Sequence, residues 1–258
     1  MPDRGPFATY PSLRDRVVVI TGGASGIGEA LVEAFSAQGS RVIFLDIQDA
    51  AAEALTSKIA AAGFPTPAYF HCDLTDIAAL QNTMREVLLQ NPIIDVLINN
   101  AGNDTRHKIE DVTSEFWDRT MAVNLKQQFF MAQAVIPAMK RTQRGSILNM
   151  SSIGWMIPSM NVAVYATAKA AIVGLTRTLA HELGANNIRV NSILPGAILT
   201  ERQKQLWFTE EYKAEILASQ ALQRMLLPEE VARLALFLAA DDSSAITSQA
   251  YIIDGGWV

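Results

Sequence analysis

The sequence predicts an α/β protein: a doubly wound parallel sheet of seven strands, covered on both faces by helices in three αβα layers. Short runs rich in β-branched residues alternate with longer segments of helical periodicity, which is typical of parallel strands joined by helical crossovers. Half of the 258 residues are hydrophobic, enough for one large core. No repeat or low-complexity tract interrupts the alternation, so we expect one domain over residues 1–258.

The strands and helices follow from these patterns. The segments predicted as strands are Arg16–Thr21, Arg41–Asp46, Thr66–Cys72, Val96–Asn99, Ser146–Met150, Arg189–Ile193 and Tyr251–Ile253. The segments predicted as helices are Ile27–Gln38, Ala50–Ala62, Ile77–Gln90, Ser114–Lys140, Val162–Leu183 and Glu229–Ala239. Ligands of such sheets bind outside the carboxyl ends of the strands, so we look there for a site.

Composition excludes several classes of function. A net charge of −5 argues against a nucleic-acid partner. The longest apolar runs, such as Val17–Ile20, are too short for a membrane span. The polar start Met1–Pro11 does not resemble a secretion signal, so we expect a cytoplasmic protein. The single cysteine, Cys72, is expected to be a buried strand residue. His71 and His181 have no partner at metal-ligand spacing, so no metal site is predicted.

A glycine-rich segment joins the first predicted strand to the first helix. Gly22, Gly26 and Gly28 would let backbone amides at the helix N-terminus approach a pyrophosphate. Their spacing differs by one residue, in its first gap, from the commonest dinucleotide fingerprint. Glycine-rich turns also serve only to bend a chain, so the loop needs support from elsewhere.

That support comes from Asp46, which ends the second strand 18 residues after Gly28. A carboxylate there can accept hydrogen bonds from the adenosine ribose hydroxyls and would repel a 2′-phosphate. No Arg or Lys occurs in Gly22–Ile27 or Ile47–Asp49 to offset that repulsion, so NAD is favoured over NADP. The alternative is a strand-end cap in a protein that binds no nucleotide.

Tyr165 and Lys169 are four residues apart near the start of a predicted helix, so they project from one face. A phenol is a poor base at neutral pH, and a nearby ammonium would lower its pKa. The preceding strand brings Ser151 and Ser152 to its carboxyl end, where a hydroxyl can hold a substrate oxygen beside the phenol.

Together with Asn99–Gly102 and Asn124, these motifs resemble the short-chain dehydrogenase/reductase family, from Arg16 to Trp257. The resemblance implies a Rossmann-like fold, a homotetramer and a catalytic set of Asn124, Ser152, Tyr165 and Lys169. By the same resemblance, Ser152, thirteen residues before Tyr165, is expected to be the catalytic serine rather than Ser151. The residues expected to bind the cofactor are Gly22, Ser25, Gly26, Ile27, Gly28, Asp46, Ile47, Asp73, Leu74, Asn100, Ala101, Gly102, Tyr165, Lys169, Pro195, Gly196, Ile198 and Thr200.

The resemblance implies that Tyr165, as a phenolate, removes the substrate hydroxyl proton while a hydride passes to the nicotinamide. Lys169 would lower the phenol pKa and bind the ribose hydroxyls, and Asn124 would hold a water next to Lys169. Residues 195–227 follow a strand end and mix polar residues with Trp207, Phe208 and Tyr212, so we interpret them as a substrate lid. An ordinary pair of surface helices is the alternative.

Substrate choice depends on loops around this scaffold. Residues 103–108 are polar or charged, and Trp155 adds an aromatic face, a combination that suits a sugar. A plain solvated loop is the alternative.

Residues 99–108, 201–203 with Trp207, and 254–257 resemble bacterial sugar 1-dehydrogenases acting on D-xylose, L-arabinose, D-galactose or L-fucose. The resemblance implies oxidation of an aldose at its anomeric carbon to an aldonolactone. The expected substrate contacts are Asn103, Ser152, Trp155, Asn161, Tyr165, Arg202 and Gln203, with His107 a further candidate.

Two other functions stay open. A polyol, steroid or 3-hydroxyacyl substrate could use the same scaffold, although the polar loop disfavours a long acyl chain and Asp46 disfavours NADPH. A non-catalytic dinucleotide sensor would have no need of Ser152, Tyr165 and Lys169.

Overall fold

The parallel sheet has the strand order β3-β2-β1-β4-β5-β6-β7, as seen in a computed structural model that describes residues 7–206 and 209–258. The strands are β1 (Val17–Thr21), β2 (Arg41–Asp46), β3 (Ala68–His71), β4 (Val96–Asn99), β5 (Gly145–Met150), β6 (Ile188–Pro195) and β7 (Ala250–Ile253). The predicted seven-stranded, doubly wound architecture is confirmed.

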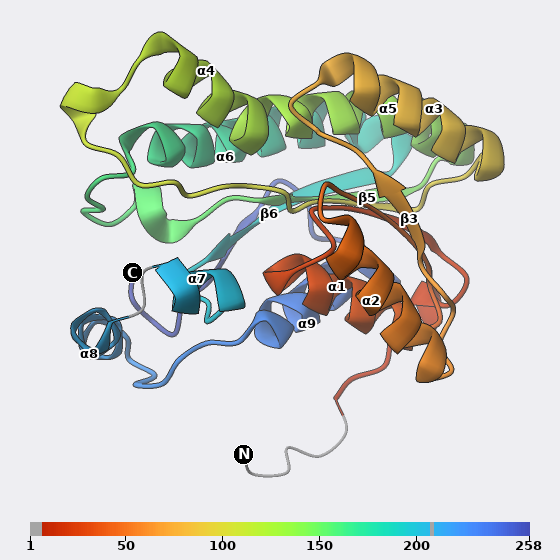
Figure 1. Cartoon of the computed structure of the whole chain (residues 1–258). Coiled ribbons are helices and arrows are strands. Elements are labelled where there is room, and N and C mark those ends of the chain that lie inside the picture. Colours follow the sequence, from red (N-terminus) through yellow and green to blue (C-terminus); the bar gives the residue numbers. More distant parts are fainter. Residues whose placement is uncertain (1–6, 207–208) are drawn as a thin grey trace.

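Helices cover both faces of the sheet (Figure 1). On one face lie α1 (Gly26–Ala37), α2 (Asp49–Ala61) and α9 (Pro228–Ala239). On the other lie α3 (Ile77–Gln90), α4 (Ser114–Met121), α5 (Gln127–Thr142) and α6 (Ala163–Leu183). Among the helices of residues 7–206 and 209–258, none is long and apolar enough to cross a bilayer.

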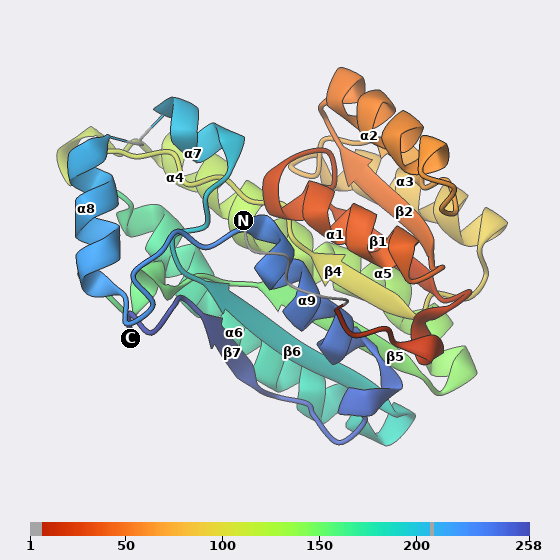
Figure 2. The ribbon, with the colours of Figure 1, turned by 90° about the horizontal axis from the view of Figure 1, so that it is seen from below.

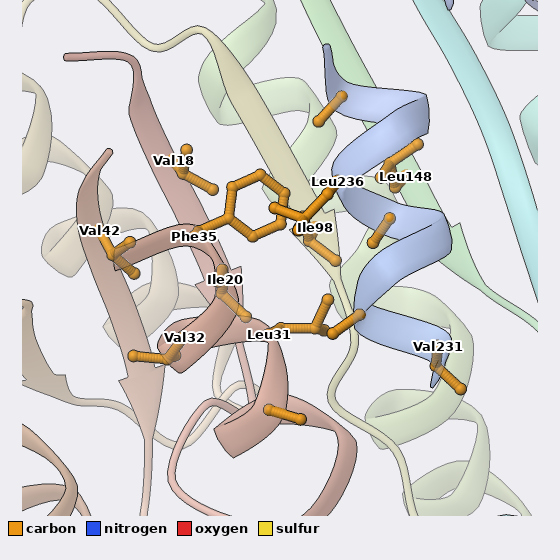
Figure 3. Packing of buried hydrophobic residues seen from close by; sticks show 14 of the residues in the cluster. Val18, Ile20, Leu31, Val32, Phe35, Val42, Ile98, Leu148, Val231 and Leu236 are labelled. Atoms are coloured by element: carbon orange, nitrogen blue, oxygen red, sulfur yellow. The ribbon is translucent and has the colours of Figure 1, made fainter. Parts of the chain in front are cut away.

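Each face of the sheet has its own hydrophobic core. Figure 3 shows Phe35 of α1 packed against the sheet and against Leu236 of α9. Phe35 is fully buried, and burial of a side chain of that size contributes about 1.5–3 kcal/mol. On the opposite face, α3, α5 and α6 pack around Met131, Leu97 and Ile147. These cores fix the helices, and thereby the loops that leave the carboxyl ends of the strands.

The sheet reverses its winding between β1 and β4, which pair in parallel with Val18 opposite Val96 and Ile20 opposite Ile98. Strands β2 and β3 lie on one side of β1 in the sheet, and strands β4 to β7 lie on the other side. Ligands of open α/β sheets bind in the crevice at such a reversal. The loops after β1 and β4 are therefore placed next to each other at the carboxyl edge.

One expected helix differs from the structure. The segment Ser114–Lys140 is not one regular helix, because a π-helical turn at Ala122–Lys126 separates α4 from α5. Such turns widen a helix by one residue and often mark functional positions. Asn124 lies within this turn and is fully buried.

The segment between β6 and α9 contains two short helices, α7 (Glu201–Leu206) and α8 (Glu210–Ser219). Both lie beyond the carboxyl end of β6 (Figure 2). A bridge between Ile198 and Leu226 joins the two ends of the segment, and the Leu199 N–H donates to the Leu226 carbonyl at 2.8 Å. Trp207 and Phe208, named above as lid residues, lie outside the described residues.

Candidate active site

A cavity of about 770 Å³ opens at the carboxyl edge, over the reversal between β1 and β4. Every residue expected to bind the cofactor lines it, and so do five of the expected substrate contacts: Asn103, Ser152, Tyr165, Arg202 and Gln203. Trp155 and Asn161, both described in the structure, are not among the lining residues. The structure therefore brings most of the expected site together in one space.

The glycine loop forms one end of this cavity at the N-terminus of α1. A side chain on Gly28 would place its Cβ only 1.8 Å from the carbonyl oxygen of Gly22. Asn100, after β4, donates from Nδ2 to the carbonyls of Thr21 and Gly22 at 3.0 and 2.9 Å. The loop is thus held in a fixed shape, with helix N–H groups exposed to an anion.

The Asp46 carboxylate is buried beside this loop and anchors it. Its Oδ2 accepts from the Ala24 N–H at 2.9 Å, and its Oδ1 accepts from the N–H groups of Ile47 and Gln48 at 2.7 and 3.0 Å. A carboxylate has about four acceptor sites, and Oδ2, which accepts from the Ala24 N–H, keeps a lone pair for one more donor, such as a ribose hydroxyl. The bare glycine cradle, the helix N-terminus and this acceptor fit a nicotinamide dinucleotide.

The end of the cavity that we expect to be catalytic, called the catalytic end below, contains Tyr165 and Lys169, both on α6. The ammonium of Lys169 lies 5.5 Å from the centre of the Tyr165 ring and donates to the Met150 carbonyl at 2.9 Å. Lys169 is almost fully buried. The two side chains share one helix face, as their spacing predicts.

The pKa values of this pair do not follow our expectation. Desolvation raises the pKa of Tyr165 to about 12, although hydrogen bonding to Ser152 lowers it and the charge of Asp104 raises it further. Desolvation also lowers the pKa of Lys169 to about 8, against an opposing effect of Asp104. Burial, which the sequence pattern does not reveal, therefore dominates the pKa of the phenol, and the group that lowers this pKa is Ser152 and not Lys169.

Ser152 and Ser151 have different roles at the end of β5. Ser152 Oγ accepts from the Gly154 N–H at 3.0 Å and reaches Tyr165. Ser151 Oγ is buried and donates to the Lys169 carbonyl at 2.7 Å. Since only Ser152 hydrogen-bonds to the phenol, the geometry supports Ser152 as the serine that meets a substrate oxygen.

Asn124 in the π-helical turn holds the loop that follows β4. Its Oδ1 accepts from the Asn103 N–H at 2.9 Å, and its Nδ2 donates to the Asn103 and Thr120 carbonyls at 2.9 and 3.0 Å. A Cβ on Gly102 would lie 3.0 Å from Asn124 Oδ1 and 3.1 Å from Lys169 Nζ. The absence of a side chain at Gly102 thus leaves space between the amide and the ammonium.

The wall where we expect the substrate to bind is built from the loop after β4 and from α7. Arg202 Nη2 donates to Asn103 Oδ1 at 3.2 Å, and Arg202 Nε lies 3.6 Å from Asp104 Oδ1. Trp155 instead donates from Nε1 to Ser151 Oγ at 3.3 Å, and Asn161 accepts the His107 N–H through its backbone carbonyl. The wall beside Tyr165 is therefore polar.

Three comparisons with known proteins agree with this geometry. A family model described as enoyl-(acyl carrier protein) reductase matches residues 22–258. The chain is 49% identical over 251 residues to a Rhizobium meliloti protein named probable galactose dehydrogenase GalD, covering 97% of this chain and 98% of that one. It is 47% identical over 250 residues to D-xylose 1-dehydrogenase of Caulobacter vibrioides, with coverage of 97% and 98%. The chain belongs to the short-chain dehydrogenase/reductase family.

Solved structures place this short-chain dehydrogenase/reductase in the same fold. A 3-oxoacyl-[acyl-carrier protein] reductase from Brucella melitensis, with bound NAD, superposes with a TM-score of 0.88 and 33% identity over 96% of this chain and 94% of that one. The protein is accordingly an oxidoreductase of a family that uses a nicotinamide dinucleotide. Within residues 7–206 and 209–258, no group of three or more His, Cys, Asp or Glu side chains is arranged to hold a metal.

For two residues of the polar loop 103–108, the structure shows contacts that the sequence does not predict. The sequence makes His107 a candidate sugar contact, yet its Nε2 accepts from the Val164 N–H at 3.4 Å and its ring packs on Phe116. Asp104 lines the cavity beside Arg202. The position of Asp104 in a polar loop after β4 was a usable signal, whereas nothing in the sequence links His107 to α6.

Proposed function

We propose that this enzyme oxidises the anomeric hydroxyl of an aldose to the aldonolactone, with NAD as the hydride acceptor. The observation that carries the proposal is one cavity that joins Ser152, Tyr165 and Lys169 to the polar wall of Asn103, Arg202 and Gln203. Relatives at 49% and 47% identity whose names specify galactose and D-xylose dehydrogenases support a sugar substrate.

The chain's own groups act on the substrate oxygen. Ser152 donates a hydrogen bond to it, and Tyr165 removes its proton. Bound NAD supplies a hydride acceptor and a positive charge that adds to that of Lys169. Because the pKa of Tyr165 is raised to about 12 by burial, ionisation of the phenol depends on these two charges. Lys169 therefore acts by stabilising the phenolate.

Asp46 supports NAD rather than NADP. Its buried carboxylate lies in the cavity and already accepts three backbone N–H groups, so it is fixed in place. The 2′-phosphate of NADP would be repelled by this carboxylate. The residues Gly22–Ile27 and Ile47–Asp49 contain no Arg or Lys to offset the repulsion.

Further features of the enzyme belong to the same proposal. Residues 195–227 act as a lid, since Arg202 and Gln203 of this segment line the cavity. One domain over residues 1–258, a cytoplasmic location and a homotetramer are expected from the sequence pattern and the family resemblance. Light scattering after size-exclusion chromatography tests the tetramer.

The decisive experiment mixes the purified protein with NAD and a panel of aldoses, polyols, steroids and 3-hydroxyacyl thioesters, and follows the absorbance of NADH. We expect turnover with aldoses and the corresponding lactone as product. Turnover only with another class would replace the aldose proposal, and binding of NADH without any turnover would favour the sensor alternative. NADP in place of NAD, and Tyr165→Phe, serve as the controls.

A further inference from the structure

Asp104 is the acidic group at the catalytic end of the cavity. The described carboxylates that line it belong to Asp46, Asp73, Asp104 and Glu201. Asp46 ends β2 and Asp73 follows β3, at the end of the cavity away from α6. Glu201 accepts from Lys204 at 2.5 Å and is mostly exposed. Asp104 is thus the carboxylate on the side of Tyr165 and Lys169.

The same end of the cavity contains two cations. Lys169 is buried, and Arg202 extends from α7 to Asp104 Oδ1 at 3.6 Å and to Asn103 Oδ1 at 3.2 Å. The charge of Asp104 acts on the catalytic pair, because it raises the pKa of both Tyr165 and Lys169. Asp104 therefore offsets positive charge at the place where a substrate must bind.

We propose that Asp104 makes the site selective for neutral sugars over sugar acids by occupying Arg202 and balancing its charge. The inference rests on the proposed aldose oxidation and adds its substrate class. A free guanidinium would offer a planar pair of donors to a substrate carboxylate. With Asp104 beside it, that carboxylate meets a like charge, whereas sugar hydroxyls can donate to Asp104.

The chemical step is the same for a neutral aldose and for a uronic acid. In both, the C1–H bond breaks and its electron pair leaves as a hydride to NAD, the C1 hydroxyl gives its proton to Tyr165, and the lactone carbonyl forms. A change in preference between the two therefore reports on recognition and not on the reaction.

The test compares D-galactose with D-galacturonate, and D-glucose with D-glucuronate, as substrates of the full-length enzyme with NAD. Each pair differs at C6, where a hydroxymethyl group replaces a carboxylate. We expect the parent enzyme to favour the neutral member in kcat/KM by about tenfold or more. Asp104→Asn should shift the ratio toward the acid by about tenfold, mainly through a lower KM for the acid. Asp104→Glu keeps the charge and should retain the parent preference.

Arg202→Gln distinguishes the proposed cause. In the double variant with Asp104→Asn, the increase in kcat/KM for the acidic sugar should disappear. Alone, Arg202→Gln should lower the ratio of kcat/KM for the acidic sugar to that for the neutral sugar below the parent value. Thermal unfolding and NADH binding will show whether Asp104→Asn folds. If it does not, Arg202→Gln alone tests whether Arg202 recognises the carboxylate. An unchanged ratio in the folded Asp104→Asn variant, or in Arg202→Gln where Asp104→Asn does not fold, overturns the inference.

Failure of the proposed function has a different signature. In that case the parent enzyme oxidises neither the neutral nor the acidic sugars, although it binds NADH. If the parent oxidises D-galactose and D-galacturonate equally well, aldose oxidation stands and the role of Asp104 is wrong.

Discussion

The Val164 N–H donates a hydrogen bond to His107 Nε2 at 3.4 Å, so the start of the helix that carries Tyr165 is capped from another loop. Val162, at the N-cap position of α6, provides no side-chain cap of its own. His107 Nδ1 lies 3.2 Å from the Thr105 carbonyl, and the His107 N–H donates to the Asn161 carbonyl at 2.7 Å. His107 therefore links loop 103–108 to the start of α6 through its ring, and to the preceding residue Asn161 through its backbone N–H.

His107→Ala should lower kcat and thermal stability together, because loss of an N-cap costs about 1 kcal/mol and loosens the first turn of α6. We expect a decrease in kcat of about tenfold in the NADH assay. His71→Ala is the matched control, since His71 lies on β3 and pairs with Asp49 near the surface. Equal effects of both substitutions would refute a special role for His107.

Tyr165→Phe should abolish turnover while leaving NADH binding nearly intact, because it removes only the phenol oxygen that takes the proton. We expect a loss of about a thousandfold or more in kcat. Fluorescence titration with NADH checks the binding, and turnover within about tenfold of the parent would contradict the role of Tyr165.

Lys169→Met should change the pH dependence of stability. The folded protein releases the Lys169 proton near pH 8 and the unfolded chain releases it near 10.5, so the unfolded state binds more protons between these values. The contribution of Lys169 to the free energy of unfolding therefore rises with pH, by about 2 kcal/mol between about pH 7.5 and 9.5. The raised pKa of Tyr165 acts in the opposite direction only above the ordinary value of 10.

Urea unfolding at several pH values checks this. The parent should gain stability relative to Lys169→Met as the pH rises. Parallel curves for the two proteins would show that the buried ammonium is not discharged in this window.

Asp46→Asn should raise the ratio of kcat/KM for NADP to that for NAD by about tenfold, because it removes the charge that opposes a 2′-phosphate. The amide oxygen can still accept from the Ile47 and Gln48 N–H groups, but the Ala24 N–H then loses its acceptor, so thermal unfolding is measured beside the kinetics. A preference for NADP in the parent, or no change in the variant, would refute the assignment of Asp46.

Gly28→Ala should prevent dinucleotide binding, because its Cβ would lie 1.8 Å from the Gly22 carbonyl oxygen and the loop would have to move. Gly174→Ala is the matched control within α6, where a Cβ meets no other atom within 4 Å. It should stabilise the protein by up to about 1 kcal/mol, as expected for alanine in a helix interior. NADH titration and thermal unfolding separate the two outcomes, and unchanged NADH affinity in Gly28→Ala would disprove the need for a bare loop.

Much of the fold was predictable because local patterns determine it. Buried strands such as β1 and β4 are short apolar runs, and Gly28 and Asp46 lie at their expected ends of α1 and β2. Since the carboxyl ends of parallel strands share an edge, residues as distant as Gly22 and Tyr165 could be assigned to one cavity.

The remaining features depend on contacts that no local pattern encodes. The π-helical turn at Asn124 changes backbone hydrogen bonding without disturbing the apolar spacing of Ser114–Lys140. The raised pKa of Tyr165 comes from desolvation by the surrounding protein. Trp155 has an aromatic ring and Asn161 a polar amide suited to a sugar, but composition does not show whether a side chain reaches the cavity.

The bridge between Ile198 and Leu226 closes the base of residues 199–226, so this segment leaves the sheet and returns to it at one point. Exchanges confined to α7 and α8 leave the strand order in place, together with Thr200, which lies beside Gly26 of the glycine loop. Evolution, or a protein engineer, can therefore graft a different segment onto this base and retune substrate choice while the hydride-transfer machinery stays as it is.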